Sequence, residues 1–344
     1  MIFGGRERIE VSDRAAQIHA RALVADLHVD SGVVHNLVGY DITKRHSPFP
    51  YSPLVWQADI PRMIEGGVNC VGFGIVTNPL QSAAKRNRSA LNQVDYFHRI
   101  QERTDKLMIA RTAADVEQAR AQGRIAAVLG LEGAHGLHHG VEDLERLHGL
   151  GLRYLTLAHF SKNAAATPAY GKGADKDSGL SDYGCELVKA CGRIGVMIDL
   201  AHINKAGFMQ AAQLAQGPIF ASHTGVCGVM PHWRNLDDDQ LGAIAQSHGC
   251  VGVIFGCHFL SPNIRCDLDR VADHICYIAE HFGAQTPAIG SDIDGFLWTL
   301  PRGMHDISQM PALTELLCRR GFSDEELLGI LGGNFLRTMA QLDG

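Results

Sequence analysis

The fold of this chain is decided by the stretch IAAVLGLEG, residues 125–133, which is apolar except for one charge near its end. A strand with one face in water alternates apolar and polar residues, whereas a strand buried on both faces reads as a continuous apolar run. The stretch therefore predicts a strand of a parallel sheet that is covered on both faces. Its only charged residue, Glu132, stands at the carboxyl end.

Seven further runs of this kind occur along the chain, and helical patterns separate most of them. The eight predicted strands are 23–30, 68–76, 125–133, 153–159, 196–202, 218–223, 250–255 and 288–294. The predicted helices are 94–105, 113–121, 141–150, 182–193, 205–215, 238–247 and 268–282. Such alternation is the signature of a (β/α)₈ barrel, an α/β fold also called the TIM barrel. No linker of low complexity divides residues 1–344, so we predict one barrel domain.

Three other segments complete this prediction. Residues 323–342 predict closing helices, the first capped by Ser323 with Glu326 three residues later. Residues 38–56 and 160–178 follow the first and fourth predicted strands and read as long loops. Barrel enzymes build their pockets from loops at that end of the strands.

Six of the eight predicted strands end in His, Asp or Glu, residues that are costly in an apolar strand unless they are paired or bind a metal. They are His28, Asp30, Glu132, His159, Asp199, His202, His223, Asp292 and Asp294. Because side chains alternate along a strand, we expect His28 and Asp30 on one side, with Leu27 and Val29 towards the helices. A single such residue is more often structural, so the prediction depends on the whole set.

This set of side chains predicts a metal site. It contains His and carboxylates but no Cys, which favours Zn²⁺ or a similar divalent ion. It also offers more ligands than one tetrahedral ion needs. Two ions about 3.5–4 Å apart, bridged by a carboxylate, would use them all. The sequence therefore predicts a binuclear metal centre at the carboxyl ends of the strands.

Composition narrows the class of protein. The net charge of −6 argues against a nucleic-acid partner, which needs a basic face. The first residues lack the apolar run of a secretory peptide, and no apolar run approaches the roughly 20 residues of a membrane span. The nine cysteines are scattered and include no CxxC pair, so we expect a reduced, cytoplasmic protein without membrane contact.

Nine short segments resemble, in the same order, the renal (membrane) dipeptidases and their bacterial relatives. They read DLHVD (26–30), LEGAH (131–135), RYLTLAH (153–159), GLSDYG (179–184), IDLAH (198–202), SH (222–223), RNLDD (234–238), GSDIDG (290–295) and GGNFLR (332–337). Each segment is weak alone, but nine in order are specific. The resemblance runs from about residue 22 to residue 337 and implies a zinc-dependent dipeptidase on a (β/α)₈ barrel.

The resemblance also implies a role for each ligand. His28 and Asp30 would bind the first zinc ion, His202 and His223 the second, and Glu132 would bridge the two. The implied cofactors are two Zn²⁺ ions or other divalent ions.

The resemblance further implies the residues that act on substrate. Asp292 would be the acid/base residue, and His159 would polarise the scissile carbonyl or stabilise the oxyanion. Arg234 would bind the free carboxylate of the substrate, a dipeptide of the type L-Xaa-L/D-Xaa. A homodimer is common among such relatives. At the seventh strand, where relatives often read Asn-Phe-Tyr, this chain has Cys257-His258-Phe259, which leaves the side-chain preference open.

Several alternatives stay open at this point. Arg234 could instead form a surface salt bridge with Asp237 or Asp238, and Asp294 could replace Asp292. His135, His138 and His139 are expected at the surface or in supporting contacts, whereas Asp26 and Asp199 could orient ligating histidines.

The nearest alternative function is a related metal-dependent amidase, lactonase or deaminase, including enzymes acting on N-acyl amino acids. Many of these bridge their metals with a carboxylated lysine, and no lysine occurs in the predicted strands. A non-catalytic metal-binding scaffold would require the loss of a catalytic residue, and none of the expected ones is missing.

Overall fold

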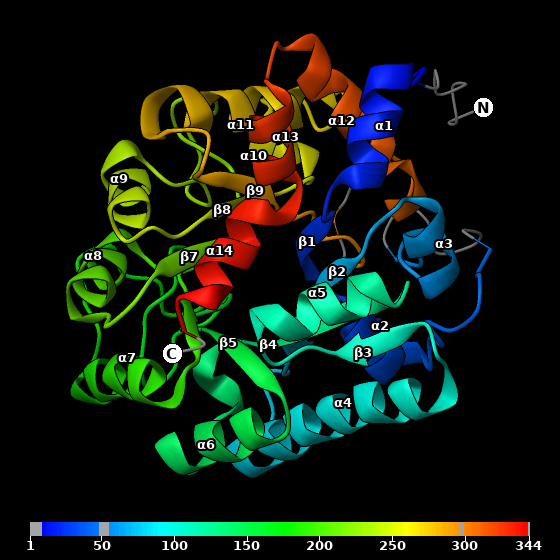
Figure 1. Cartoon of the computed structure of the whole chain (residues 1–344). Coiled ribbons are helices and arrows are strands. Elements are labelled where there is room, and N and C mark those ends of the chain that lie inside the picture. The colour runs from blue at the N-terminus through cyan, green and yellow to red at the C-terminus, as the bar shows by residue number, and fades with distance from the viewer. Residues whose placement is uncertain (1–8, 48–54, 296, 298, 343–344) are drawn as a thin grey trace.

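The structure is a closed parallel β-barrel with helices around it, as Figure 1 shows. It is a computed structural model that describes residues 9–47, 55–295, 297 and 299–342. Its strands are β1 (Ala25–Val29), β2 (Cys70–Val76), β3 (Leu107–Ile109), β4 (Ile125–Glu132), β5 (Leu152–Thr156), β6 (Met197–Asp199), β7 (Ile219–Thr224), β8 (Val251–Val253) and β9 (Pro287–Ile289).

Eight of these strands close the barrel in the order β1-β2-β4-β5-β6-β7-β8-β9, and β9 pairs with β1. They correspond to the eight predicted strands, which confirms the (β/α)₈ architecture. The ninth strand, β3, pairs with the first half of β4, while β5 pairs with the second half. Sequence reasoning missed β3 because its apolar run, Leu107–Ala110, has only four residues and lies between the charged residues Lys106 and Arg111.

The polar ends of several predicted strands lie beyond the regular strand. β6 ends at Asp199 and β9 at Ile289, several residues before the predicted ends at 202 and 294. His202, Asp292 and Asp294 adopt positive φ angles of 66°, 60° and 67°. Such left-handed residues other than glycine are uncommon and gather at functional sites, where surrounding contacts hold them.

One prediction about β1 is wrong. Between Asp26 and Val29 the register against β2 shifts, so that two residues of β1 stand opposite one residue of β2. Val29 packs in the outer core under the helices, as expected. Leu27, however, packs in the inner cluster with Tyr154, although it was expected beside the helices. A β-bulge interrupts the alternation of side chains, which explains the error.

The helices form the outer layer (Figure 1). They are α1 (Asp13–Arg21), α2 (Ser31–Val38), α3 (Ile60–Glu65), α4 (Ala83–Arg103), α5 (Ala113–Ala121), α6 (Val141–Gly149), α7 (Asp182–Ile194), α8 (Lys205–Leu214), α9 (Asp238–Gln246), α10 (Cys257–Leu260), α11 (Asp269–Phe282), α12 (Met310–Arg319), α13 (Asp324–Leu328) and α14 (Asn334–Ala340). The predicted helices all occur, but α1, α2, α3, α10 and α12 were missed. α4 begins 11 residues before the predicted start at 94, because its first half is polar and lacks an apolar stripe.

The closing helices plug one end of the barrel and leave the other for polar side chains. Phe335 and Met339 of α14 join the inner apolar cluster, which includes Tyr154 and Phe220 from the strands. Ser323 forms the predicted capping box with Glu326 at the start of α13. The inner cluster thus fills the amino end of the barrel. None of the helices in the described ranges is long and apolar enough to cross a lipid bilayer.

The two predicted loops differ in how much of them can be described. The loop at 160–178 contains no helix, and backbone hydrogen bonds join Lys172 to Phe160 and Lys162 and join Ala169 to His202. In the other predicted loop, α2 extends to Val38, and residues 48–54 lie outside the described residues.

Candidate metal centre

Polar side chains from six different strand ends meet at the carboxyl end of the barrel. They form three overlapping groups, each with its potential ligand atoms within 4.8 Å of one another. The groups are His28–Glu132–His223, Glu132–His159–His202 and His28–Asp30–Asp292. All five predicted metal ligands and both predicted catalytic residues are therefore brought together.

Glu132 lies between the histidines, with its two carboxylate oxygens facing different partners. Its Oε1 atom is 2.9 Å from Nε2 of His202 and 3.3 Å from Nε2 of His223. Its Oε2 atom is 3.6 Å from Nε2 of His28. A carboxylate so placed can donate one oxygen to each of two cations. This position is suited to the bridging role that the family resemblance implies for Glu132.

The other side of the site is built from His28, Asp30 and Asp292. Asp30 Oδ1 lies 3.4 Å from His28 Nε2, yet neither of these buried atoms makes a hydrogen bond. Glycine at position 74 leaves room beside them, because a Cβ atom there would lie 2.3 Å from Asp30 Oδ1 and 3.0 Å from His28 Nε2. Buried polar atoms without partners are costly, and a bound cation would satisfy them.

The donor set fits divalent cations. Nε2 of His202 and Nε2 of His223 are 2.9 Å apart, and both point at the same carboxylate oxygen. Imidazole nitrogens and carboxylate oxygens in this combination suit Zn²⁺ and similar ions. Residues His28 and Asp30 would hold one cation, His202 and His223 another, with Glu132 common to both.

The electrostatics of the site put Glu132, His202 and His223 in the protonation states that bind metals. The pKa of His28 is instead raised well above its usual value, because the lowering effect of burial is outweighed by Tyr154, Glu132 and Asp30. Burial, together with the nearby guanidinium of Arg234, holds the pKa of His202 well below its usual value. Burial, His28 and Arg234 act in the same way on the pKa of His223. Burial opposes ionisation of Glu132, but the surrounding histidines outweigh it and hold the Glu132 pKa well below its usual range. Neutral imidazoles and an ionised carboxylate are the forms that bind metals.

The pKa of Asp292 is shifted in the direction opposite to that of Glu132. Burial, followed by the negative charge of Asp30, raises the pKa of Asp292 well above its ordinary value. Divalent cations beside it would oppose this rise, because positive charge favours the carboxylate. Asp294, two residues on, accepts hydrogen bonds from Ser31 Oγ at 2.7 Å and from the backbone N–H of Gln57 at 2.7 Å. Asp292, not Asp294, is thus the one grouped with the candidate ligands.

A hydrogen-bonded chain behind His223 orients its ring. Nδ1 of His223 donates to Ser222 Oγ at 2.7 Å, and Ser222 Oγ donates in turn to Asp199 at 2.7 Å. Thr156 Oγ1 donates to the same Asp199 oxygen at 2.5 Å. This arrangement leaves the lone pair of His223 Nε2 for a metal. The expected orienting role of Asp199 therefore operates through Ser222, which sequence reasoning missed although it directly precedes the ligand.

Asp26 was expected to orient the ring of His28, but the contacts of this ring are different. Asp26 accepts a hydrogen bond from the backbone N–H of His28 at 3.3 Å and two from Ser291, but the His28 ring is not among its partners. The ring Nδ1 of His28 instead lies 3.4 Å from the hydroxyl of Tyr154, which projects from β5 into the barrel. Asp26 thus positions the backbone of β1, and the imidazole contacts a tyrosine that the sequence did not single out.

His159 lies at the open side of the cluster. Its side chain is 20% exposed, and its Nε2 atom is 3.7 Å from Glu132 Oε1. It can therefore face both the ligands and a molecule entering from solvent. His135 lies nearby but is buried, bonded through Nε2 to Ser161 Oγ at 2.8 Å, and burial lowers its pKa to about 4. His135 is thus a supporting residue and not a surface one.

Arg234 is buried beside the ligands and not paired at the surface. Its Nη2 atom donates to the backbone oxygen of His223 at 2.5 Å, while its buried Nε atom has no hydrogen-bond partner. The alternative of a surface ion pair is wrong, because Asp237 pairs with Lys205 at 2.7 Å and Asp238 accepts from the hydroxyl of Tyr277.

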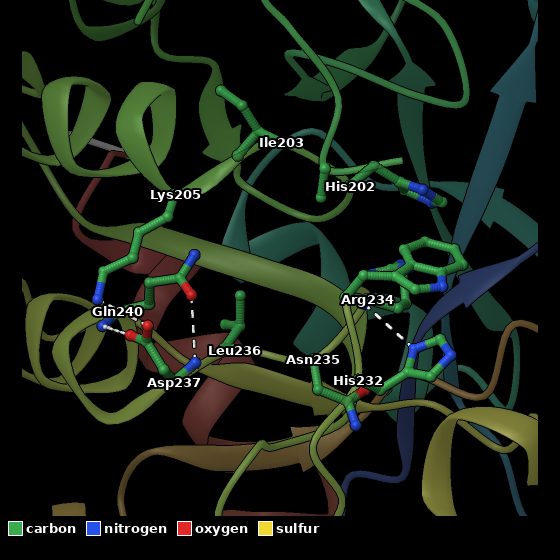
Figure 2. Close-up of a pocket in the computed structure, with 11 residues that line it drawn as sticks. His202, Ile203, Lys205, His232, Arg234, Asn235, Leu236, Asp237 and Gln240 are labelled. Carbon is green, nitrogen blue, oxygen red and sulfur yellow. Dashed lines mark hydrogen bonds and ion pairs between the residues drawn. The ribbon is translucent and has the colours of Figure 1, made fainter. Parts of the chain in front are cut away.

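Arg234 also lines a cavity of about 190 Å³, together with His202. Figure 2 shows these two side chains on one side of the view and Lys205 with Asp237 on the other. A buried guanidinium with an unsatisfied N–H beside a cavity is suited to bind an anionic group of a ligand.

Comparisons of the sequence with known proteins point to one family. A family model described as membrane dipeptidase (peptidase family M19) matches residues 12–343. Dipeptidase verJ from Clonostachys rogersoniana is 34% identical over 260 residues, and the match spans 74% of this chain but only 66% of that protein, slightly less than two thirds.

Solved structures show the same fold. A dipeptidase described as a metallopeptidase of family M19 has a TM-score of 0.82 and 26% identity, covering 93% of this chain and 98% of its own. A metallopeptidase from Rhodobacter sphaeroides, liganded with a phosphinate mimic of the dipeptide L-Ala-D-Ala, has a TM-score of 0.82 at 24% identity. The match covers 93% of this chain and 99% of that protein.

Proposed function

Since this chain belongs to the membrane dipeptidase family, peptidase family M19, we propose that it is a binuclear zinc dipeptidase. The observation that carries the proposal is the position of Glu132, whose two oxygens face His202 and His223 on one side and His28 on the other. Five candidate ligands divided in this way supply two cation sites that share one carboxylate. The proposed substrate is a dipeptide with a free carboxylate.

The chemistry of hydrolysis follows from what the site contains. Divalent cations held by the five candidate ligands would lower the pKa of water, which would make a nucleophile available near neutral pH, and would polarise a carbonyl group. Asp292 would take the proton from that water and deliver it to the amine of the departing residue. His159, on the open side of the ligand cluster, would donate a hydrogen bond to the oxyanion; losing one such donor typically costs about 10²–10³ in rate.

Arg234 would select for dipeptides over longer chains. A guanidinium pairs with a carboxylate through two parallel hydrogen bonds. A longer peptide would place a neutral amide at this position and leave the buried charge unpaired. Both L and D residues are proposed at the carboxyl-terminal position. A relative that binds a mimic of L-Ala-D-Ala supports this proposal for the D form.

Metal analysis combined with a rate panel tests the function. We expect purified protein to contain about two zinc ions per chain and to hydrolyse simple dipeptides such as Ala-Ala and Ala-D-Ala. Removal of metal by a chelator should abolish hydrolysis, and added Zn²⁺ should restore it. Faster turnover of N-acyl amino acids or lactones than of any dipeptide would favour the related amidases and lactonases instead.

Substituting Arg234 by methionine tests the carboxylate clamp. We expect KM for dipeptides to rise by about tenfold or more, the effect of losing one hydrogen bond to a charged group. Zinc content should stay the same, because Arg234 contacts only the backbone of a candidate ligand. Arg234→Lys keeps the charge but not the planar guanidinium, so its KM should lie between those of the wild type and Arg234→Met. An unchanged KM for Arg234→Met would reject this role.

A further inference from the structure

Three aromatic side chains with unusually high exposure gather beside the candidate metal centre. Phe160, Tyr170 and Trp233 are 43%, 56% and 40% exposed, whereas most large apolar side chains of the described residues are buried. The rings of Tyr170 and Trp233 stack with centroids 4.3 Å apart, and Phe160 meets Trp233 edge-on at 6.5 Å. We call these three residues the aromatic shelf. Contiguous exposed apolar surface of this kind marks a binding site.

The aromatic shelf adjoins the groups that would act on a substrate. Phe160 directly follows His159, and its ring centroid lies 4.9 Å from that of His202. Trp233 directly precedes Arg234 and lines the same cavity as Arg234 and His202. The shelf therefore lies next to both the candidate metal centre and the residue proposed to bind the free carboxylate.

The shelf is held in place before any ligand binds. The loop that carries Phe160 and Tyr170 is closed on itself, since Lys172 N–H donates to Phe160 O at 3.0 Å and Lys162 N–H donates to Lys172 O at 2.8 Å. Trp233 packs edge-on against Phe259, with ring centroids 5.9 Å apart. A preformed apolar surface loses little conformational entropy when it binds a ligand.

Charge around the shelf also favours an apolar ligand group. Lys205, a cationic residue lining the adjoining cavity, is paired with Asp237 at 2.7 Å and Asp239 at 2.6 Å. Its charge is therefore largely neutralised locally. An anionic side chain laid on the shelf would lose hydration without gaining a partner from the three rings, whereas an aromatic or large aliphatic side chain would bury apolar surface.

We propose that the aromatic shelf is the subsite for the side chain of the residue that carries the free carboxylate, and that it selects aromatic and large aliphatic side chains. The assignment to this residue rests on the cavity that Trp233 and Arg234 line together. This inference rests on the proposed dipeptidase function. The preferred substrate class is thus a dipeptide whose carboxyl-terminal residue resembles phenylalanine or leucine.

Steady-state kinetics of the zinc-loaded full-length protein test the proposal. The substrates are Ala-Ala, Ala-Leu, Ala-Phe, Ala-Glu and Phe-Ala, and the measured quantity is the ratio of each kcat/KM to that of Ala-Ala. We expect Ala-Phe and Ala-Leu to exceed Ala-Ala by about tenfold, the scale of discrimination in an apolar pocket. Ala-Glu should show no such gain.

Substitutions then locate the source of the preference. Trp233→Ala should remove most of the Ala-Phe to Ala-Ala ratio, and Trp233→Phe should restore part of it. Ile64→Ala is the matched control, because Ile64 is also an exposed apolar residue, 50% exposed. It lies on α3, which precedes the amino end of β2, whereas the aromatic shelf lies at the carboxyl ends of the strands. Circular dichroism and zinc content of each variant verify that fold and metal site persist.

The outcomes separate this inference from the proposed function. If no dipeptide is hydrolysed by the zinc-loaded protein, the function itself fails. If dipeptides are hydrolysed but Trp233→Ala leaves every ratio unchanged, the function stands and the subsite is rejected. If Trp233→Ala lowered the ratio of Phe-Ala to Ala-Ala and left the ratio of Ala-Phe to Ala-Ala unchanged, the assignment to the carboxyl-terminal residue would be overturned. A change in oligomeric state without a change in ratios would identify the shelf as a contact between chains and overturn the proposal.

Discussion

Replacing Glu132 by glutamine is expected to lower kcat/KM by at least about 100-fold and to reduce bound zinc below two ions per chain. Even residues that only support a ligand typically cost about 10–100-fold in metal affinity or activity when removed. Glu132 stands between His28, His202 and His223 and contributes an oxygen to each side. Glutamine would offer one neutral oxygen and place an NH₂ group against one set of imidazoles.

Zinc measured by atomic spectroscopy, together with kcat/KM, provides the readout for this variant. Glu315→Gln is the matched control, because Glu315 is also a buried carboxylate, 5% exposed, but bonds Ser12 and Arg319 away from the site. We expect that control to lose stability and to keep its zinc. Two zinc ions and unreduced activity in Glu132→Gln would contradict the shared-carboxylate arrangement.

Asp292→Asn is expected to lower kcat by about 10²–10⁴-fold, the usual contribution of a general acid–base residue. Asparagine has nearly the same shape but cannot take up a proton from water or return it to the leaving amine. Because Asp292 is not among the five proposed ligands, bound zinc should stay close to two ions per chain. KM should change much less than kcat, since the change affects a proton transfer and not the carboxylate clamp.

Asp294→Asn supplies the comparison for this prediction. Both aspartates are in the same segment, are deeply buried and have positive φ. Asp294, however, bonds Ser31 and the backbone of Gln57, so its substitution should affect thermal stability more than kcat. Our assignment would be wrong if Asp294→Asn lowered kcat more than Asp292→Asn did, or if Asp292→Asn retained wild-type kcat.

Much of the candidate site could be predicted from the sequence because its residues are costly where they stand. A histidine or carboxylate at the end of a buried strand, such as Glu132 after seven apolar residues, requires a hydrogen-bonding or oppositely charged partner or a metal ion. The parallel barrel then brings all such ends to one rim. The specific assignments of His159, Arg234 and Asp292 came from the family resemblance, since residue type alone does not distinguish Asp292 from Asp294.

Predictions of secondary structure were most accurate where a periodic pattern was long. The eight barrel strands were found, whereas β3 and the helices α1, α2, α3, α10 and α12 were missed. The strands that were found overlap predicted runs of six or more residues, even where the strand itself has only three, whereas the apolar run at β3 has four. The helices α2, α3 and α10 are too short to show a helical stripe. The start of α4 was not predicted, because this polar segment has no apolar stripe. Tertiary contacts fix it as a helix, such as the hydrogen bond from the side chain of Asn87 to the backbone oxygen of Gly136.

The sequence by itself determined the barrel, the rim that carries the site and the kinds of side chain available to bind metal. These depend on residue polarity and on the two-residue period of a strand, which are local properties. The tertiary structure alone decided how those side chains are aimed. The bulge in β1, the Asp199–Ser222–His223 chain and the aromatic shelf all join residues from separate strands or loops. Such contacts arise only when the barrel closes, because register and neighbour identity are set by long-range pairing.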